Sequence, residues 1–486
     1  MSFDLHAAAR KALAENGFVA DFPPAVLSEV QHLGDPAKSE SIEVRDLKTL
    51  PWSSIDNDSS KDLDQVEVAE TLPNGDVRVR VGIADVDALV PAGSETDKFA
   101  RANSTSVYTG VETFPMLPER LSTDLTSLRQ DAERPVVVIE FTVSADGNVN
   151  GHDIYMALVN NQAKLAYSSV GRWLDGQSTL PPVATQTIQD QLHLQDATAD
   201  LLRANRAKAG ALSLDTIEAQ SVVHADDSVS IELVAKTNAS NLIEDFMITA
   251  NVAMAHFLEE RGSPSIRRIV KTPERWPRIV DLAAKHGETL PAEPNSPALE
   301  QFLSKMRERE PDHFADLSLA VVKLIGPGEY ALHTPGAGDT EHFGLATHDY
   351  THSTAPNRRF ADLVTQRLVK AVLAGKPSPY SNDELTEIAK HCTEREDAAR
   401  KVERQVRKVA AAVSMSHRIG EEFDAIVTGA NQNGVFVRLM HPPVEGRVTK
   451  SHEGMDVGER VRVRLLSTEP EKGFIDFAGI AAKGPA

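Results

Sequence analysis

The 486-residue chain is too long for one ordinary domain, and its length predicts two to four. Its 41% hydrophobic and 25% charged residues are typical of a soluble globular protein, and no stretch approaches the roughly 20 apolar residues needed to span a bilayer. The net charge of −20 argues against a protein that coats nucleic acid non-specifically, although local positive potential in a channel would still admit one strand. A single cysteine, Cys392, excludes an internal disulfide, and the N-terminus lacks a secretion signal, so we expect a cytoplasmic protein with no membrane contact.

Residues 1–45 are expected to form a small helical region. Leu5 to Asn16 has helical spacing and is followed by Gly17, a favoured C-terminal cap. Pro23-Pro24 predicts the start of a second short helix, because proline is tolerated in a first turn. Two short helices joined by a tight connection are typical of a helix-turn-helix nucleic-acid element, or equally of a cap packed on the main domain.

Residues 46–415 are expected to form a large mixed α/β domain. Val66 and Val68 alternate with Glu67 and Ala69, and an Asn-Gly turn follows. Residues 77–83 alternate again, which predicts a hairpin whose second strand is half-buried. A further strand is predicted over residues 136–143. Long helical patterns occupy residues 199–209, 241–261, 297–309, 360–373 and 383–416, the last as one helix or two.

Residues 419–482 change in character to five short alternating strands, which predict a small OB-fold β-barrel. Phe436 offers an aromatic ring for base stacking. Positive charge on this barrel comes from Arg438, Lys450, Arg460, Arg462 and Arg464. We therefore expect an RNA-binding domain here, with a barrel used for protein contacts as the alternative.

Four aspartates, Asp56, Asp58, Asp62 and Asp64, lie in one loop just before the predicted hairpin. Magnesium prefers hard oxygen ligands, and two such ions can activate water and stabilise the leaving oxygen in phosphoryl displacement. The spacing also resembles a calcium-binding EF-hand loop. That alternative is disfavoured because Lys61 stands where the sharp turn needs glycine.

The segment from Ser54 to Gln65 resembles the signature of the RNase II catalytic (RNB) domain, a Thr/Ser-Ile-Asp followed by Asp-x-Asp-Asp. Further segments resemble the same family in the same order, and the C-terminal barrel resembles the OB-type domain that usually follows. The resemblance covers about residues 45 to 410, including the segments Val81 to Val86, Tyr108 to Leu128, Leu242 to Asn251 and His342 to Asp362.

The resemblance implies a hydrolytic 3′-to-5′ exoribonuclease that degrades single-stranded RNA from its 3′ end to nucleoside 5′-monophosphates, with Mg²⁺ as cofactor. It implies that Asp56, Asp62 and Asp64 hold Mg²⁺ and position the attacking water. Arg358 matches the arginine that steadies the scissile phosphate. It follows Pro356-Asn357 before a predicted helix, whose N-terminal amides favour anions.

RNA contacts are implied by the same resemblance. Tyr108 matches an aromatic residue that stacks on the 3′-terminal base, and Glu403 matches a glutamate near the terminal riboses. A contact to the 2′-hydroxyl is how such a site distinguishes RNA from DNA. His342, Arg359 and Phe436 are further expected RNA contacts.

Two departures from the family pattern leave alternatives open. Gln65 replaces the fourth aspartate of the metal site, and an amide oxygen can bind Mg²⁺ but brings no charge. The chain could therefore be a catalytically weakened RNA-binding protein, or a metal-dependent phosphodiesterase acting on DNA or a small phosphoester. The second aromatic of the 3′-end clamp is also not evident, because Ile266 to Thr272 offers Arg and Lys instead.

Overall fold

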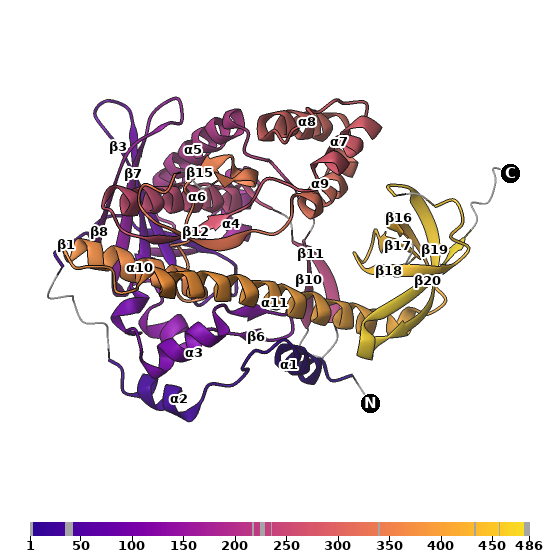
Figure 1. Cartoon of the computed structure of the whole chain (residues 1–486), viewed down its shortest axis with the longest axis horizontal. Coiled ribbons are helices and arrows are strands. Elements are labelled where there is room, and N and C mark those ends of the chain that lie inside the picture. Colours follow the sequence, from indigo (N-terminus) through magenta and orange to yellow (C-terminus); the bar gives the residue numbers. More distant parts are fainter. Residues whose placement is uncertain are drawn as a thin grey trace.

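The computed structural model describes residues 3–34, 42–215, 218–223, 229–234, 236–338, 341–431, 434–455 and 457–480. A large α/β part and a C-terminal barrel are connected by α11 (Asn382–Met415), a single long helix that crosses much of the molecule (Figure 1). The multidomain architecture with a terminal barrel is therefore confirmed. The domain bounds 1–45, 46–415 and 419–482 stay predictions.

The α/β part is built on a seven-stranded mixed sheet with the order β1-β8-β7-β4-β3-β2-β9. Its β1–β8 and β2–β9 pairs are parallel, and the predicted hairpin is the antiparallel pair β3–β4. The strands are β1 (Val44–Asp46), β2 (Ser53–Asp56), β3 (Gln65–Thr71), β4 (Val77–Ala84), β7 (Glu133–Val143), β8 (Val149–Asn160) and β9 (Ala163–Ala166).

Strand β3 is more deeply buried than the alternation of its sequence indicates. Its residues from Gln65 to Ala69 are all buried, so both faces of this strand are covered. One reason is that α5 packs against β3, where the Gln191 side chain bonds both the N–H and the carbonyl of Ala69. Alternation in the sequence revealed the strand but not the layer that covers its second face.

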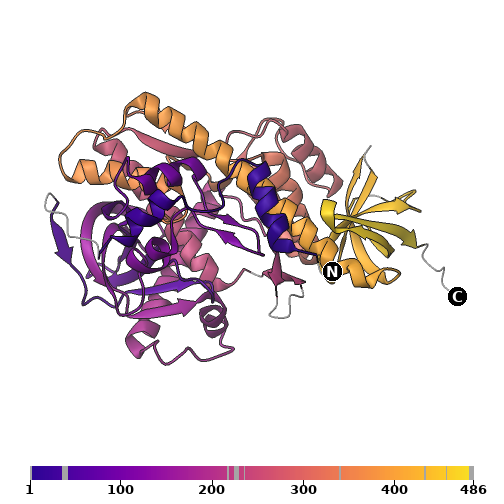
Figure 2. The same ribbon diagram turned by 90° about the horizontal axis from the view of Figure 1, so that it is seen from below.

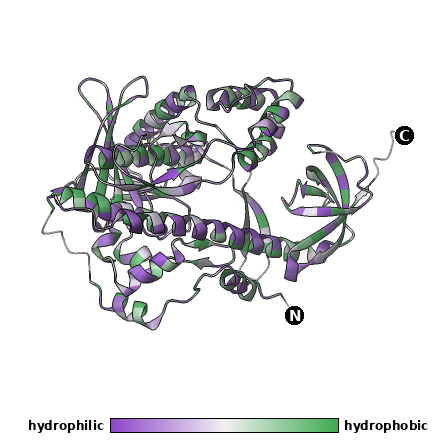
Figure 3. Cartoon of the chain, viewed as in Figure 1, coloured by the Kyte–Doolittle hydropathy of each residue, from purple (hydrophilic) through white to green (hydrophobic). Residues whose placement is uncertain are grey.

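Helices surround this sheet, and α6 packs against β7 and β8, where Phe246 and Phe141 make an edge-to-face contact. Three more helices share a separate apolar core around Trp276 and Phe302. The hydrophobic strands and the mixed surfaces of the helices are visible in Figure 3. The helices are α3 (Glu95–Asn103), α4 (Tyr167–Leu174), α5 (Gln186–Ala209), α6 (Asn238–Glu260), α7 (Trp276–Lys285), α8 (Ser296–Arg309), α9 (Pro311–Ile325) and α10 (Phe360–Leu373). No helix in the described ranges has the length and apolarity to cross a membrane.

Short elements complete the α/β part. They include two antiparallel pairs that border the site described below, β5 with β6 and β12 with β13. Their bounds are β5 (Val107–Tyr108), β6 (Thr113–Phe114), β10 (Glu218–Val223), β11 (Val229–Val234), β12 (Ser265–Ile269), β13 (Glu329–His333), β14 (Glu341–His342) and β15 (Thr347–His348).

The N-terminal helices pack on the rest of the chain. Helix α1 (Leu5–Glu15) lies along α11, as Figure 2 shows, and its Leu13 shares an apolar cluster with Val402 and Val406. Helix α2 (Pro24–Gln31) packs on α3. This is the arrangement expected of a packed cap.

The C-terminal barrel is closed, with strand order β16-β17-β18-β20-β19, the order of an OB-fold. Alternate residues such as Val437, Val463 and Phe477 fill its interior. Met415, at the end of α11, belongs to the same core and so anchors the barrel to this helix. Its strands are β16 (Glu422–Asn431), β17 (Gly434–Leu439), β18 (Glu445–Lys450), β19 (Arg460–Glu469) and β20 (Phe474–Ile480).

Candidate active site

The predicted carboxylate cluster lies in the loop from β2 to β3. Asp56 is the last residue of β2, and its Oδ1 accepts hydrogen bonds from the Asn57 N–H at 2.7 Å and the Ser60 hydroxyl at 2.9 Å. The Ser127 side chain fixes the middle of the loop, because it accepts from the Leu63 N–H and donates to the Lys61 carbonyl. The loop is thus held by strands at both ends and by a buried serine between them.

Asp64 and Arg358 meet although they are far apart in the sequence. Asp64 is 2% exposed. Its Oδ1 accepts from the Asn357 N–H, and its Oδ2 from the Arg358 Nε, both at 3.2 Å. The amide just ahead of α10 therefore binds an anionic group, as expected, but that group is a carboxylate of the protein. Burial raises the pKa of Asp64 to about 7, and Arg358 opposes this rise while Asp62 adds to it.

Asp56, Asp62 and Asp64 lie close enough to affect one another. Burial raises the pKa of Asp62, and the negative charge of Asp56 adds to the rise. Gln65, at the start of β3, is 7% exposed and directly follows this cluster. Across the described ranges no group of three Asp, Glu, His or Cys side chains is arranged to coordinate a metal ion by itself. Magnesium, however, usually takes only one or two carboxylates and completes its shell with water and substrate phosphate.

A cation nevertheless fits the chemistry of this region. Glu67, two residues after Gln65, is fully buried, and neither oxygen of its carboxylate has a hydrogen-bond partner in the described part of the chain. A buried carboxylate without a partner is strongly unfavourable unless a positive charge or a proton neutralises it. The donor set is therefore hard, oxygen-based and short of positive charge, which suits Mg²⁺.

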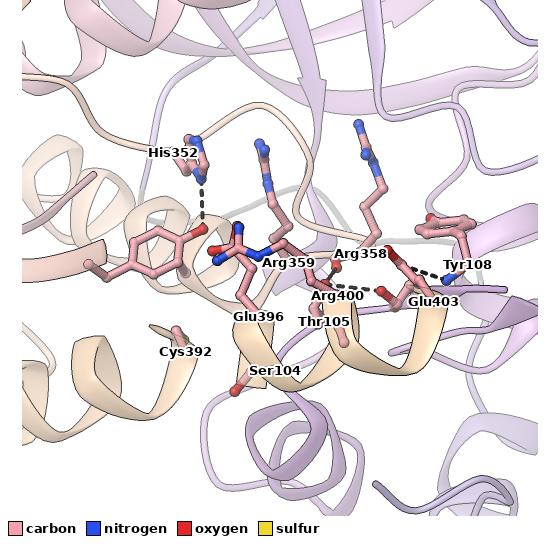
Figure 4. Close-up of a pocket in the computed structure, with 14 residues that line it drawn as sticks. Ser104, Thr105, Tyr108, His352, Arg358, Arg359, Cys392, Glu396, Arg400 and Glu403 are labelled. Carbon is pink, nitrogen blue, oxygen red and sulfur yellow. Dashed lines mark hydrogen bonds and ion pairs between the residues drawn. The ribbon is translucent and has the colours of Figure 1, made fainter. Parts of the chain in front are cut away.

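A pocket adjoins the aspartates and collects most of the predicted RNA-binding residues (Figure 4). Tyr108, Arg358, Arg359 and Glu403 line it, from β5, the segment before α10, and α11. Glu403 Oε1 accepts a hydrogen bond from the Tyr108 N–H at 3.1 Å, which ties α11 to β5. The remaining residues that line the pocket are Ser104, Thr105, Ser106, Tyr330, His352, Ala361, Cys392, Glu396, Ala399 and Arg400.

The electrostatics of Tyr108 show that the pocket and the carboxylates are neighbours. The Tyr108 residue as a whole is 44% exposed. Burial of its hydroxyl end raises the pKa of Tyr108 to about 12, with Arg358 opposing the rise and Asp62 and Asp64 adding to it. The Tyr108 side chain therefore lies close to Arg358 and to the aspartates.

Arg359 is fixed at the pocket wall by a two-point contact. Its Nε and Nη2 donate to the two carboxylate oxygens of the fully buried Asp362 at 2.9 and 2.6 Å. Burial alone would lower the pKa of Arg359, but Asp362 outweighs it and the pKa is raised. The guanidinium thus remains charged and its orientation is defined.

The pocket also contains Tyr330 and His352, which were not among the expected site residues. The Tyr330 hydroxyl lies 2.7 Å from His352 Nδ1, and Arg268 stacks over the Tyr330 ring at 4.7 Å. Tyr330 faces Arg268 across the β12–β13 pair, so it lies beside the stretch in which a second aromatic was not evident. Tyr330 is only 7% exposed, so it forms a wall of the pocket and not an open stacking surface.

His342 and Phe436 do not join this pocket. His342 lines a different pocket beside Arg203 and Arg206 of α5, and burial lowers its pKa to about 4. Phe436 lies on β17 of the barrel. Their expected contacts with RNA are therefore separate from the 3′-end site.

Comparisons with known proteins identify the family of this chain. The RNB domain model matches residues 44–375, and the model of the RNase II-type exonuclease C-terminal S1 domain matches residues 421–479. The chain is 30% identical to Ribonuclease R 1 of Lactococcus lactis subsp. lactis, over 96% of this chain and 60% of that protein. It thus spans 60% of the length of this curated relative.

Solved structures share the fold. Mycoplasma genitalium RNase R, in complex with ribose methylated single-stranded RNA, matches with a TM-score of 0.88 and 23% identity, over 98% of this chain and 78% of that one. Yeast Ssd1, described as a pseudonuclease, matches with a TM-score of 0.73 and 17% identity, over 92% of this chain and 56% of that one. Given the family-model match over most of its length, the chain belongs to the RNB domain family and carries an RNase II-type C-terminal S1 domain.

Proposed function

We propose that the chain is a metal-dependent exoribonuclease that hydrolyses single-stranded RNA from its 3′ end and releases nucleoside 5′-monophosphates. One observation carries this proposal: the ion pair between the buried Asp64 and Arg358 adjoins a pocket lined by Tyr108 and Glu403. Phosphate chemistry, base stacking and ribose recognition are thus available side by side.

Each residue has a distinct role in this proposal. Tyr108 stacks on the terminal base, and Glu403 accepts a hydrogen bond from a terminal 2′-hydroxyl. Arg358 leaves Asp64 to bind the scissile phosphate, which has the charge and the oxygen geometry that a guanidinium prefers. Arg359, held by Asp362, adds a fixed positive charge at the same wall.

The aspartates position the reacting groups. Asp56, Asp62 and Asp64, with the Gln65 amide, would hold Mg²⁺, which when bound makes a water more acidic and stabilises charge on the phosphate and on the leaving 3′-oxygen. Water attacks the last phosphodiester phosphorus, the bond to the 3′-oxygen of the preceding nucleotide breaks, and that oxygen takes a proton. The products are a nucleoside 5′-monophosphate and an RNA shorter by one nucleotide with a new 3′-hydroxyl.

His342 and Phe436 would contact RNA outside the 3′-end pocket, Phe436 as part of the barrel that receives the strand. We place this activity in the cytoplasm, since the lone Cys392 is buried and unpaired, as suits a reducing compartment.

A weakened RNA-binding protein is the second candidate, because Gln65 removes one charge from the site. Product analysis distinguishes the candidates. Purified protein with Mg²⁺ should convert RNA, but not DNA of the same sequence, to nucleoside 5′-monophosphates on anion-exchange chromatography. RNA that is bound but remains intact would support the weakened protein, and equal cleavage of DNA would support a general phosphodiesterase.

A further inference from the structure

Glu67 differs from the other buried carboxylates around the site. Asp362 is paired with Arg359, and Asp85 is paired with Lys370 at 2.8 Å. Both oxygens of Glu67 lack any hydrogen-bond partner in the described ranges, and the residue is 0% exposed. Buried charges are normally paired or coordinate metals, so this side chain calls for a cation or a proton.

The register of the sheet places Glu67 beside the aspartate loop. Alternate residues of a strand share a face, so Gln65 and Glu67 point to the same side of β3. Glu67 lies opposite Ser53 of β2, the strand that ends at Asp56. The Ser53 hydroxyl is also buried without a partner, so the polar atoms at this point of the sheet are unsatisfied together.

Tyr167, at the start of α4, lies beside the end of β2. Ala166 of β9 is opposite Asp56 of β2, and Tyr167 is the next residue. After burial, Asp56 and then Glu67 raise the pKa of Tyr167, so both carboxylates lie in its neighbourhood. Side chains on β2, β3 and α4 are therefore neighbours in this part of the sheet.

We propose that Glu67 serves as a ligand of the active-site metal ion and supplies the negative charge that Gln65 does not provide. This inference rests on the proposed metal-dependent function. It explains how a site with glutamine in place of a family aspartate retains enough charge to bind Mg²⁺. It also gives the unpartnered carboxylate a positive partner.

The test measures metal binding without RNA and without turnover. Mn²⁺ is titrated by calorimetry into the full chain and into Glu67→Gln, which keeps the side-chain shape and removes the charge. Loss of a ligand should weaken binding by more than the roughly 10- to 100-fold that loss of an outer-shell partner costs. Glu140→Gln is the control, because Glu140 lies in the same sheet but is paired with Arg80, and it should leave Mn²⁺ affinity unchanged.

Two further variants keep the test decisive. Gln65→Asp in the Glu67→Gln background should restore most of the lost affinity, because it returns a carboxylate to the site. Glu67→Leu should fold at least as stably as the parent chain without metal, because replacing an unpaired buried charge with an apolar group is neutral or stabilising. If Glu67→Gln and Glu67→Leu bind Mn²⁺ as tightly as the wild type, the role of Glu67 as a ligand is overturned and the proposed function is not. A wild-type chain that binds no metal would overturn the proposed metal-dependent function as well.

Discussion

Glu403 should contribute to the discrimination between RNA and DNA through its charge. Its Oε1 accepts from the Tyr108 N–H at 3.1 Å, and its carboxylate lines the pocket beside that ring. Glu403→Gln keeps an acceptor for this N–H but presents a neutral group to the ribose. A hydrogen bond to a charged group contributes about 1.5–3 kcal/mol and a neutral one about 0.5–1.5 kcal/mol. The difference, about 1–1.5 kcal/mol, corresponds to about 5- to 10-fold in rate.

The assay compares single-turnover removal of the last nucleotide from an all-ribose strand and from strands with one 2′-deoxynucleotide near the 3′ end. The rate penalty for the deoxy substitution should be about 5- to 10-fold smaller in Glu403→Gln than in the wild type. Glu394→Gln, an exposed change on the same helix, should keep the full penalty. An equal deoxy penalty in wild type and Glu403→Gln would refute the assignment of Glu403 to the ribose.

Two further predictions concern stability. Tyr330→Phe leaves the partly buried His352 Nδ1 without its 2.7 Å partner, so urea denaturation should show a loss of about 1–3 kcal/mol in the free energy of unfolding. An unchanged free energy of unfolding would contradict the contact. Burial lowers the pKa of His342 to about 4, whereas an unfolded histidine titrates near 6.5. The unfolded chain therefore takes up this proton first, and stability should fall as the pH drops from about 6.5 to about 4. His342→Gln should remove this loss of stability at low pH, whereas the exposed His417→Gln should not. Equal stability-versus-pH profiles for the two variants would exclude His342 as the group responsible.

Local patterns predicted the elements that a short stretch of sequence determines. The apolar spacing over residues 360–373 gave α10 with its observed bounds, and strict alternation after Gly420 gave the strands of the barrel. The segment from 383 to 416 was left as one helix or two, because its dense charge obscured the apolar stripe. The structure shows one helix, stabilised along its length by α1, β13 and the barrel core.

The pairing of strands distant in the sequence determined which side chains meet at the site, and local sequence patterns did not show this. Tyr330 enters the pocket because β13 pairs with β12 in the register that places it opposite Arg268, and no local pattern encodes that register. Glu67 alternates with Val66 and Val68, and this local pattern does not reveal that its side chain is buried. It is buried because a second layer covers β3. The aspartate cluster was identified from its spacing and Arg358 from the family resemblance, whereas the contact between Asp64 and Arg358 follows from the fold.

The central claim is tested most directly with a 5′-labelled single-stranded RNA incubated with Mg²⁺ and either wild type or Asp64→Asn. Asp64 holds Arg358 and lies among the proposed metal ligands, and asparagine keeps its size. Metal-dependent 3′-to-5′ cleavage at this site should give a descending ladder that ends in a very short 5′ product, and the ladder should be lost with Asp64→Asn or with a chelator. RNA that stays intact with wild type, or a ladder that persists with Asp64→Asn, would contradict it.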